Sequence, residues 1–186
     1  EEPRSAVVLS DFIMPKMTTS AMLLFGVTYV AYGALYFARK PFAVVKGTLE
    51  IEAGISRDSL ALIDSALLAM YAIGQLSLGY TVKLLGSKAP LVLSFALAGA
   101  FTAAVGLVDS PLLMALFWGG SGLTAAVSNP LFCIMLAEAL PVSVRATALG
   151  IWSSCQQLGG ISANLVAGVV LARYGWRSVF FVAGGP

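Results

Sequence analysis

The sequence alternates between long apolar runs and short polar stretches. Most runs approach or exceed the ~20 residues that an α-helix needs to cross ~30 Å of hydrocarbon. Charged residues, glycine and proline gather at the boundaries, as in Arg39-Lys40-Pro41, Gly86-Ser87-Lys88 and Asp109-Ser110-Pro111. The pattern predicts five complete helices and the beginning of a sixth, at about residues 21–40, 60–82, 89–108, 112–140, 146–172 and 176–186.

These runs determine the predicted fold class. Lipid admits only helices and closed barrels as spanning structures, because every backbone polar group must be paired internally. The runs are far longer than the ~10 alternating residues of a barrel strand. The prediction is an all-α membrane protein with a polar lead-in over residues 1–19 and a transmembrane helical bundle over residues 20–186. Small residues such as Gly74, Gly79 and Gly159 favour close packing of the helices into a bundle.

The composition excludes several other classes. Hydrophobic residues make up 59% of the 186 positions and charged residues 11%, with a mean hydropathy of +0.90, which excludes an ordinary soluble domain. The absence of histidine excludes histidine-ligated metals and histidine-based catalysis by this chain. Two isolated cysteines do not form a disulfide scaffold, and a net charge of +2 is too small for nucleic-acid binding. We therefore expect no enzyme, no cofactor and no metal site.

The adjoining cations Arg39 and Lys40 are the strongest functional candidates, because a cation within a membrane helix costs at least ~2.5–3.5 kcal/mol. In one interpretation both mark the membrane boundary and reach the headgroups. The helical face favours another interpretation. Tyr29, Tyr32, Tyr36 and Arg39 form one stripe about 15 Å long, which resembles a wall of an anion pathway. Lys40 points about 100° away from Arg39, which predicts different roles for the two.

The remaining polar side chains in the predicted spans are mostly uncharged, and each either binds a substrate or joins two helices. They are Gln75, Asn129, Gln156, Gln157 and Asn164. Asp64 lies near the start of the second predicted helix, where the macrodipole favours an acidic residue without any function. No acidic residue lies well inside a predicted span, which argues against a proton relay.

The order of the predicted elements resembles the amino-terminal half of a major facilitator transporter, in which two six-helix halves enclose the substrate path. Residues 79–88 lie at the place of that family's loop between helices two and three. Residues 138–146 look like its link between helices four and five, and residues 174–177 resemble the start of helix six. The resemblance covers about residues 20–186 and implies the first six of twelve helices, the sixth one truncated.

Within that superfamily, Tyr36-Phe37-Ala38-Arg39-Lys40-Pro41-Phe42 resembles the first-helix signature of the organophosphate:phosphate antiporters. The resemblance implies that Arg39 binds phosphate opposite an arginine of the carboxy-terminal half, with Tyr32 and Tyr36 as flanking hydrogen-bonding groups. Gln75 and Gln156 fall where bacterial members carry a lysine and, nearby, a histidine, which implies less positive charge around the site. The candidate substrate-binding residues are Arg39, Lys40, Tyr36, Tyr32, Gln75 and Gln156.

The predicted function is secondary transport by alternating access, in which a phosphorylated metabolite such as a sugar phosphate or glycerol-3-phosphate exchanges for inorganic phosphate. One alternative is a carrier of an unphosphorylated organic anion. Another is a non-transporting sensor or degenerate half-transporter, because Lys83 stands where the family's loop has an aspartate.

The expected partners are a small anionic substrate, the lipid bilayer and a carboxy-terminal six-helix half, without nucleic acid. The first residue is not Met and the final run is apolar, which suggests a fragment of a longer protein. The protein is expected in a membrane as a multi-pass protein, and the plasma or inner membrane and the endoplasmic reticulum both stay open.

Overall fold

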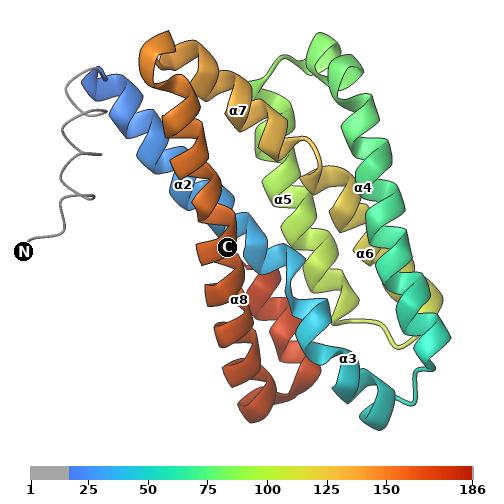
Figure 1. The fold of residues 1–186 in the computed structure, drawn as a ribbon. Coiled ribbons are helices and arrows are strands. Elements are labelled where there is room, and N and C mark those ends of the chain that lie inside the picture. The colour runs from blue at the N-terminus through green and yellow to red at the C-terminus, as the bar shows by residue number, and fades with distance from the viewer. Residues whose placement is uncertain (1–16, 186) are drawn as a thin grey trace, which may run out of the picture.

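The computed structural model describes residues 17–185, and every regular element among them is a helix (Figure 1). The predicted all-α class is therefore confirmed for this part of the chain. Most of the predicted lead-in over residues 1–19 lies outside the described residues. In chain order the helices are α2 (Thr19–Arg39), α3 (Pro41–Glu52), α4 (Arg57–Leu85), α5 (Lys88–Val105), α6 (Pro111–Ala125), α7 (Ser128–Ala139) and α8 (Val142–Gly184).

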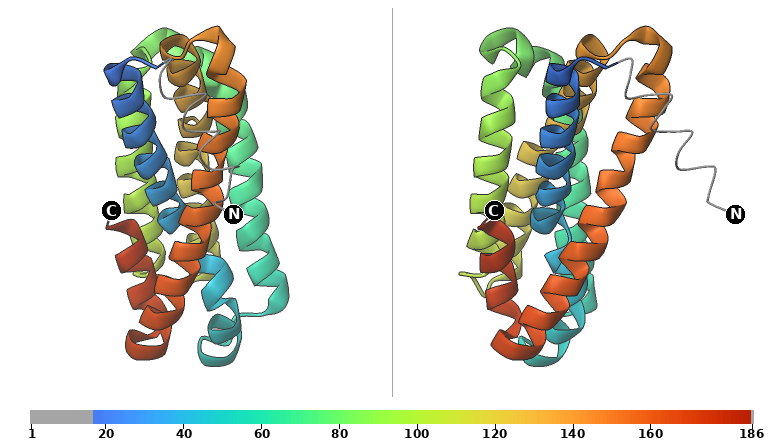
Figure 2. Two further views of the ribbon diagram at one scale, coloured as in Figure 1. Left: turned by 60° about the vertical axis from the view of Figure 1, so that its left-hand side comes forward. Right: turned by 90° about the vertical axis from the view of Figure 1, so that its left-hand side faces the viewer.

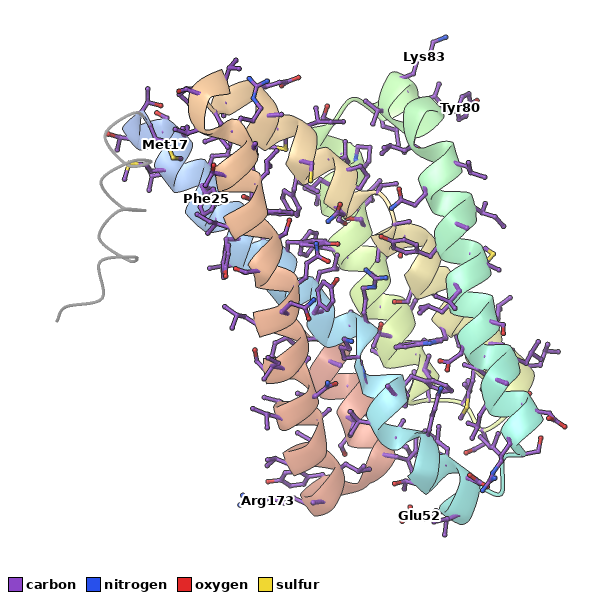
Figure 3. The ribbon with its side chains drawn as sticks, in the orientation of Figure 1. Met17, Phe25, Glu52, Tyr80, Lys83 and Arg173 are labelled. Carbon is purple, nitrogen blue, oxygen red and sulfur yellow. The ribbon has the colours of Figure 1, made fainter. Side chains whose placement is uncertain are left out.

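Five helical stretches of the described chain are long and apolar enough to cross a membrane. Their outward faces carry large apolar side chains, among which Leu76 is 88% and Val30 71% exposed. Such faces are unfavourable in water and match a hydrocarbon surrounding. Lys83 lies at one end of the bundle and Arg173 at the other (Figure 3), as expected for cations at the two membrane surfaces. The five stretches are Thr19–Glu52, Arg57–Leu85, Lys88–Val105, Pro111–Ala139 and Val142–Gly184.

Successive spans run in opposite directions and form an elongated bundle (Figures 1 and 2). The crossing of α4 and α6 depends on glycine. A β-carbon at Gly74 would lie 2.5 Å from the carbonyl oxygen of Leu123, and one at Gly122 would lie 2.6 Å from that of Leu67. Gly79, in contrast, has no described atom within 4 Å of such a β-carbon. Small residues thus permit close approach at this crossing, as predicted, but not at every glycine.

The stretch between the first two predicted helices is not entirely a loop, because residues 41–52 form α3. Pro41 occupies its first turn, where the missing N–H is tolerated. Phe42, Val45 and Leu49 are fully buried, and their spacing is that of a helix packed against a core. The interspersed charged residues obscure this apolar face in the sequence.

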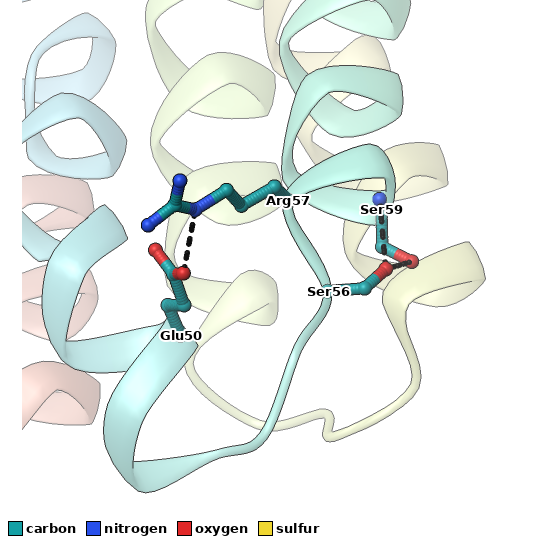
Figure 4. A network of polar contacts seen from close by, with 4 residues as sticks. All are labelled: Glu50, Ser56, Arg57 and Ser59. Carbon is teal, nitrogen blue, oxygen red and sulfur yellow. Dashed lines mark hydrogen bonds and ion pairs between the residues drawn. The ribbon is translucent and has the colours of Figure 1, made fainter.

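A short connection joins α3 to α4 (Figure 4). Ser56 caps α4, because its Oγ accepts a hydrogen bond from the backbone N–H of Ser59 at 3.3 Å. The Nε of Arg57 donates to Glu50 Oε1 at 2.7 Å across the connection. The Arg57 side chain is 84% exposed, so this ion pair stabilises by at most ~1 kcal/mol.

Two further interruptions shape the bundle. The fourth span breaks between α6 and α7 at residues 126–127, just before the Asn129-Pro130 pair. Within α8, Gly175 has a φ of 77° and a ψ of 172°, a conformation that suits glycine. The chain reverses there and returns along α5, where Arg177 donates a hydrogen bond to the carbonyl oxygen of Gly106 at 3.0 Å.

Candidate functional site

Arg39 is the last residue of α2 and lies against two aromatic rings. Its guanidinium carbon is 4.5 Å from the ring centroid of Tyr71 on α4 and 5.5 Å from that of Tyr36 on its own helix. A cation over an aromatic face at such distances gains ~0.5–2 kcal/mol. The two rings, one from α2 and one from α4, therefore hold the guanidinium between these helices.

The charge of Arg39 has no carboxylate partner within residues 17–185. The ion pairs there are Lys46–Asp64, Glu50–Arg57 and Asp109–Arg177. A cation within a membrane span usually pairs with an acid or faces a cavity. Without an acidic partner, the guanidinium keeps its planar fork of donors for a carboxylate or phosphate from outside these residues.

Two glutamines fix the aromatic rings beside the guanidinium. The hydroxyl of Tyr36 donates to Gln156 Oε1 at 2.8 Å, which links α2 to α8. The Nε2 of Gln75 donates to the hydroxyl of Tyr71 at 3.1 Å and to the carbonyl oxygen of Ala126 at 3.0 Å. Polar groups from α2, α4 and α8 therefore converge at one place in the bundle.

Tyr32, a member of the predicted set, packs deep in the interface of α2 and α8. Its side chain is 2% exposed, and its ring stacks on Trp152 with centroids 5.1 Å apart. It also meets the ring of Tyr36 edge-on at 5.7 Å. Farther along the stripe, the hydroxyl of Tyr29 is hydrogen-bonded to Ser154 at 2.7 Å. Most of the tyrosine stripe thus joins two helices, and only its last turn reaches the guanidinium.

Lys40 points to a different helix from its neighbour. A β-carbon at Gly160 of α8 would lie 3.2 Å from Lys40 Cε and 3.7 Å from Tyr36 Cδ1, so the stem of the lysine runs along a glycine surface. Arg39 instead contacts Tyr71 of α4. The adjoining cations diverge, as a turn of about 100° per residue predicts.

Tyr71 is a residue of this cluster that the sequence analysis missed. It lies four residues before Gln75 on α4, and this spacing places both side chains on one helical face. That spacing is visible in the sequence. The contact with Arg39 depends on where α2 and α4 lie in the folded bundle, which no local pattern reveals.

Both interrupted spans have their breaks beside this cluster. The first breaks where Pro41 begins α3, and the nearby Ala38 carbonyl oxygen accepts a hydrogen bond from Thr102 of α5 at 3.1 Å. At the second break, the Ala126 carbonyl oxygen accepts the hydrogen bond from Gln75. Side chains thus bind backbone groups beside both interruptions, as a membrane interior requires. Discontinuous helices of this kind are typical of transporter binding sites.

The described residues contain no group of three or more histidine, cysteine, aspartate and glutamate side chains placed to hold a metal ion. Cys133 and Cys155 are free thiols. The cluster around Arg39 offers a guanidinium, phenol hydroxyls and carboxamides. These groups are suited to recognising an anion by charge and hydrogen bonds.

Residues 17–186 match the Major Facilitator Superfamily. The chain is also similar to three named relatives. An Arabidopsis thaliana protein named as a glycerol-3-phosphate transporter is 32% identical, in an alignment that covers 83% of this chain and 33% of the relative. A Chlamydia trachomatis protein named as a hexose phosphate transport protein is 26% identical, with coverages of 88% and 36%. A Cupriavidus necator protein named as a sulfoacetate transporter is 28% identical, with coverages of 91% and 39%.

The chain spans only a third of the first of these relatives, and not much more of the others. The names of the first two agree with the resemblance to carriers of phosphate esters found in the sequence. The family match and the five apolar helices together identify a multi-pass integral membrane protein. The chain belongs to the Major Facilitator Superfamily.

Proposed function

We propose that the protein is a secondary carrier of a small organic anion and that Arg39 binds the charge of that anion. One observation carries the proposal: a guanidinium within a membrane-spanning stretch is held by Tyr36 and Tyr71 and pairs with no carboxylate of the described chain. A substrate anion would supply the missing partner. Transport, not catalysis, is the activity that these groups support.

The favoured substrate is a phosphorylated metabolite such as a sugar phosphate or glycerol-3-phosphate, exchanged for inorganic phosphate. An arginine fork matches two phosphate oxygens, and the amides of Gln75 and Gln156 suit the hydroxyl groups of a sugar or glycerol. Relatives named for such esters support this choice. The described helices would form the amino-terminal wall of the path, and a carboxy-terminal six-helix half would form the opposite wall and rock around the anion.

An unphosphorylated organic anion is the second candidate. The hydrogen bonds at the cluster come from neutral amides and phenols, and Lys40 is directed to α8. A single guanidinium suits a carboxylate or sulfonate as well as it suits a phosphate ester. The relative named as a sulfoacetate transporter favours the same reading.

The test is an exchange assay in liposomes. The liposomes contain the protein as its complete gene encodes it. Vesicles loaded with phosphate would receive labelled glycerol-3-phosphate, glucose-6-phosphate, phosphate or sulfoacetate. Arg39→Gln removes the charge, and Arg39→Lys keeps the charge but loses the fork. Arg173→Gln is the matched control. Arg173 lies exposed at one end of the bundle and takes no part in the Arg39 cluster.

We expect uptake that requires internal phosphate, survives Arg173→Gln and falls at least tenfold in both Arg39 variants, since a charge-assisted bidentate contact contributes about 1.5–3 kcal/mol. Uptake of sulfoacetate alone would select the second candidate. A folded protein that binds these anions but exchanges none would instead indicate a sensor. Full uptake by Arg39→Gln would refute the assigned role of Arg39.

A further inference from the structure

Lys46 of α3 and Asp64 of α4 form an ion pair, and α4 also carries Tyr71 of the Arg39 cluster. Because α4 is continuous from Arg57 to Leu85, the seven residues from Asp64 to Tyr71 place both on one face, ~10.5 Å apart. Lys46 follows Arg39 by seven residues, across the break at which Pro41 begins α3. Its ammonium also lies 5.6 Å from the ring centroid of Phe42.

The surroundings of the pair distinguish it from the other ion pairs of the described chain. Lys46 and Asp64 are each 38% exposed, whereas Arg57 is 84% and Asp109 is 78% exposed in their pairs. The helix macrodipole does not explain Asp64, since its influence fades within the first turn. That turn already contains Asp58, and Asp64 lies beyond it.

We propose that Asp64 sets the valence preference of the anion site by cancelling the charge of Lys46. This inference rests on the proposed function of Arg39. With Lys46 neutralised, it adds no net charge to the charge that Arg39 and its neighbour Lys40 present to an anion. Asp64 is thus a specificity-determining residue that acts through Lys46 and does not touch the anion.

The size of the effect follows from Coulomb's law. A single positive charge released ~10 Å from a bound anion strengthens the binding of a monovalent anion by about two- to fifteenfold, for effective dielectric constants between 80 and 20. The factor is squared for a divalent anion, because the interaction energy doubles. Releasing Lys46 therefore raises the preference for divalent over monovalent anions by about the same two- to fifteenfold.

The experiment measures the dissociation constants of sulfate and methanesulfonate by titration calorimetry in detergent. It uses the protein as its complete gene encodes it. Both probes are sulfur oxyanions whose valence is fixed near neutral pH. Asp64→Asn should raise the preference for sulfate, Lys46→Met should lower it, and the double variant should return it to the wild-type value. Glu50→Gln is the control, because it breaks the exposed pair with Arg57 and should leave the preference unchanged.

The two single variants should shift the preference for sulfate in opposite directions. Either of them therefore tests the proposal if the other folds poorly. Exchange in liposomes is measured in parallel. Preferences that stay within twofold of wild type in either folded single variant, while the wild type exchanges anions, would overturn the valence proposal alone. A wild type that binds neither probe and exchanges no anion would overturn the proposed function and this inference together.

Discussion

Replacing Gly74 with alanine adds one methyl group where α4 approaches α6 most closely. A β-carbon there would lie 2.5 Å from the carbonyl oxygen of Leu123 and 2.7 Å from Ala126 Cβ, whereas ordinary contact begins near 3.4 Å. The two helices would have to separate by about 0.5–1 Å. Because a backbone oxygen and a β-carbon oppose the methyl group, no side-chain rotation relieves the clash.

Two opposing free energies decide the result. Alanine gains up to about 1 kcal/mol over glycine in a helix interior, and overpacking costs about 1–3 kcal/mol. A β-carbon at Gly79 of the same helix meets no described atom within 4 Å. Gly79→Ala therefore gains helix propensity without the cost of overpacking. We expect Gly74→Ala to be less stable than Gly79→Ala by about 1–3 kcal/mol, which corresponds to the order of 5 °C in Tm.

The assay is thermal unfolding of the purified variants in detergent, followed by tryptophan fluorescence. Anion affinity provides a second reading, because Gln75 adjoins Gly74 and bonds the Ala126 carbonyl oxygen across the same crossing. Gly74→Ala should therefore weaken anion binding, while Gly79→Ala should not. Equal Tm changes in the two variants would show that α4 and α6 do not meet as closely as described, and would refute the reasoning.

Three further predictions concern single side chains. Tyr71→Leu removes the ring against Arg39 and should raise the dissociation constant for the transported anion by about three- to thirtyfold in titration calorimetry, whereas Tyr71→Phe, which keeps the ring, should change it less than threefold. Thr102→Val leaves the carbonyl oxygen of Ala38 without its side-chain donor and should lower the free energy of unfolding by about 1–3 kcal/mol in thermal unfolding, with Thr102→Ser close to wild type. Gln75→Leu should lose a comparable amount of stability and also weaken anion binding, which the same two measurements check.

The helical class was predictable and Arg39 was identifiable as a candidate site residue, because each has a local signal. Apolar runs of membrane length identify spanning helices without knowledge of their neighbours. A guanidinium inside such a run is conspicuous, since its burial is costly. The divergence of Arg39 and Lys40 was predictable as well, because it follows from the turn per residue of any α-helix.

The parts that could not be predicted depend on tertiary contacts. The helix α3 has buried positions at Phe42 and Val45, but Lys46 gives it the composition of a loop. The ion pair with Asp64 of α4 offsets the cost of the Lys46 charge within a membrane-spanning stretch. Tyr71 carries no charge to mark it, and its contact with Arg39 forms only in the folded bundle, where the two side chains reach each other from α2 and α4.

The breaks between α2 and α3 and between α6 and α7 are places where the first and fourth spans can bend beside the cluster. An unbroken helix resists bending, because each bend strains a ladder of backbone hydrogen bonds. Beside the breaks, the carbonyl oxygens of Ala38 and Ala126 accept instead from side chains of Thr102 and Gln75, which can rotate with the chain. The first and fourth spans can therefore bend at these points with little loss of backbone bonding. Since Gln75 also bonds Tyr71, a change at the proposed anion site would reach the second of these breaks through a single amide.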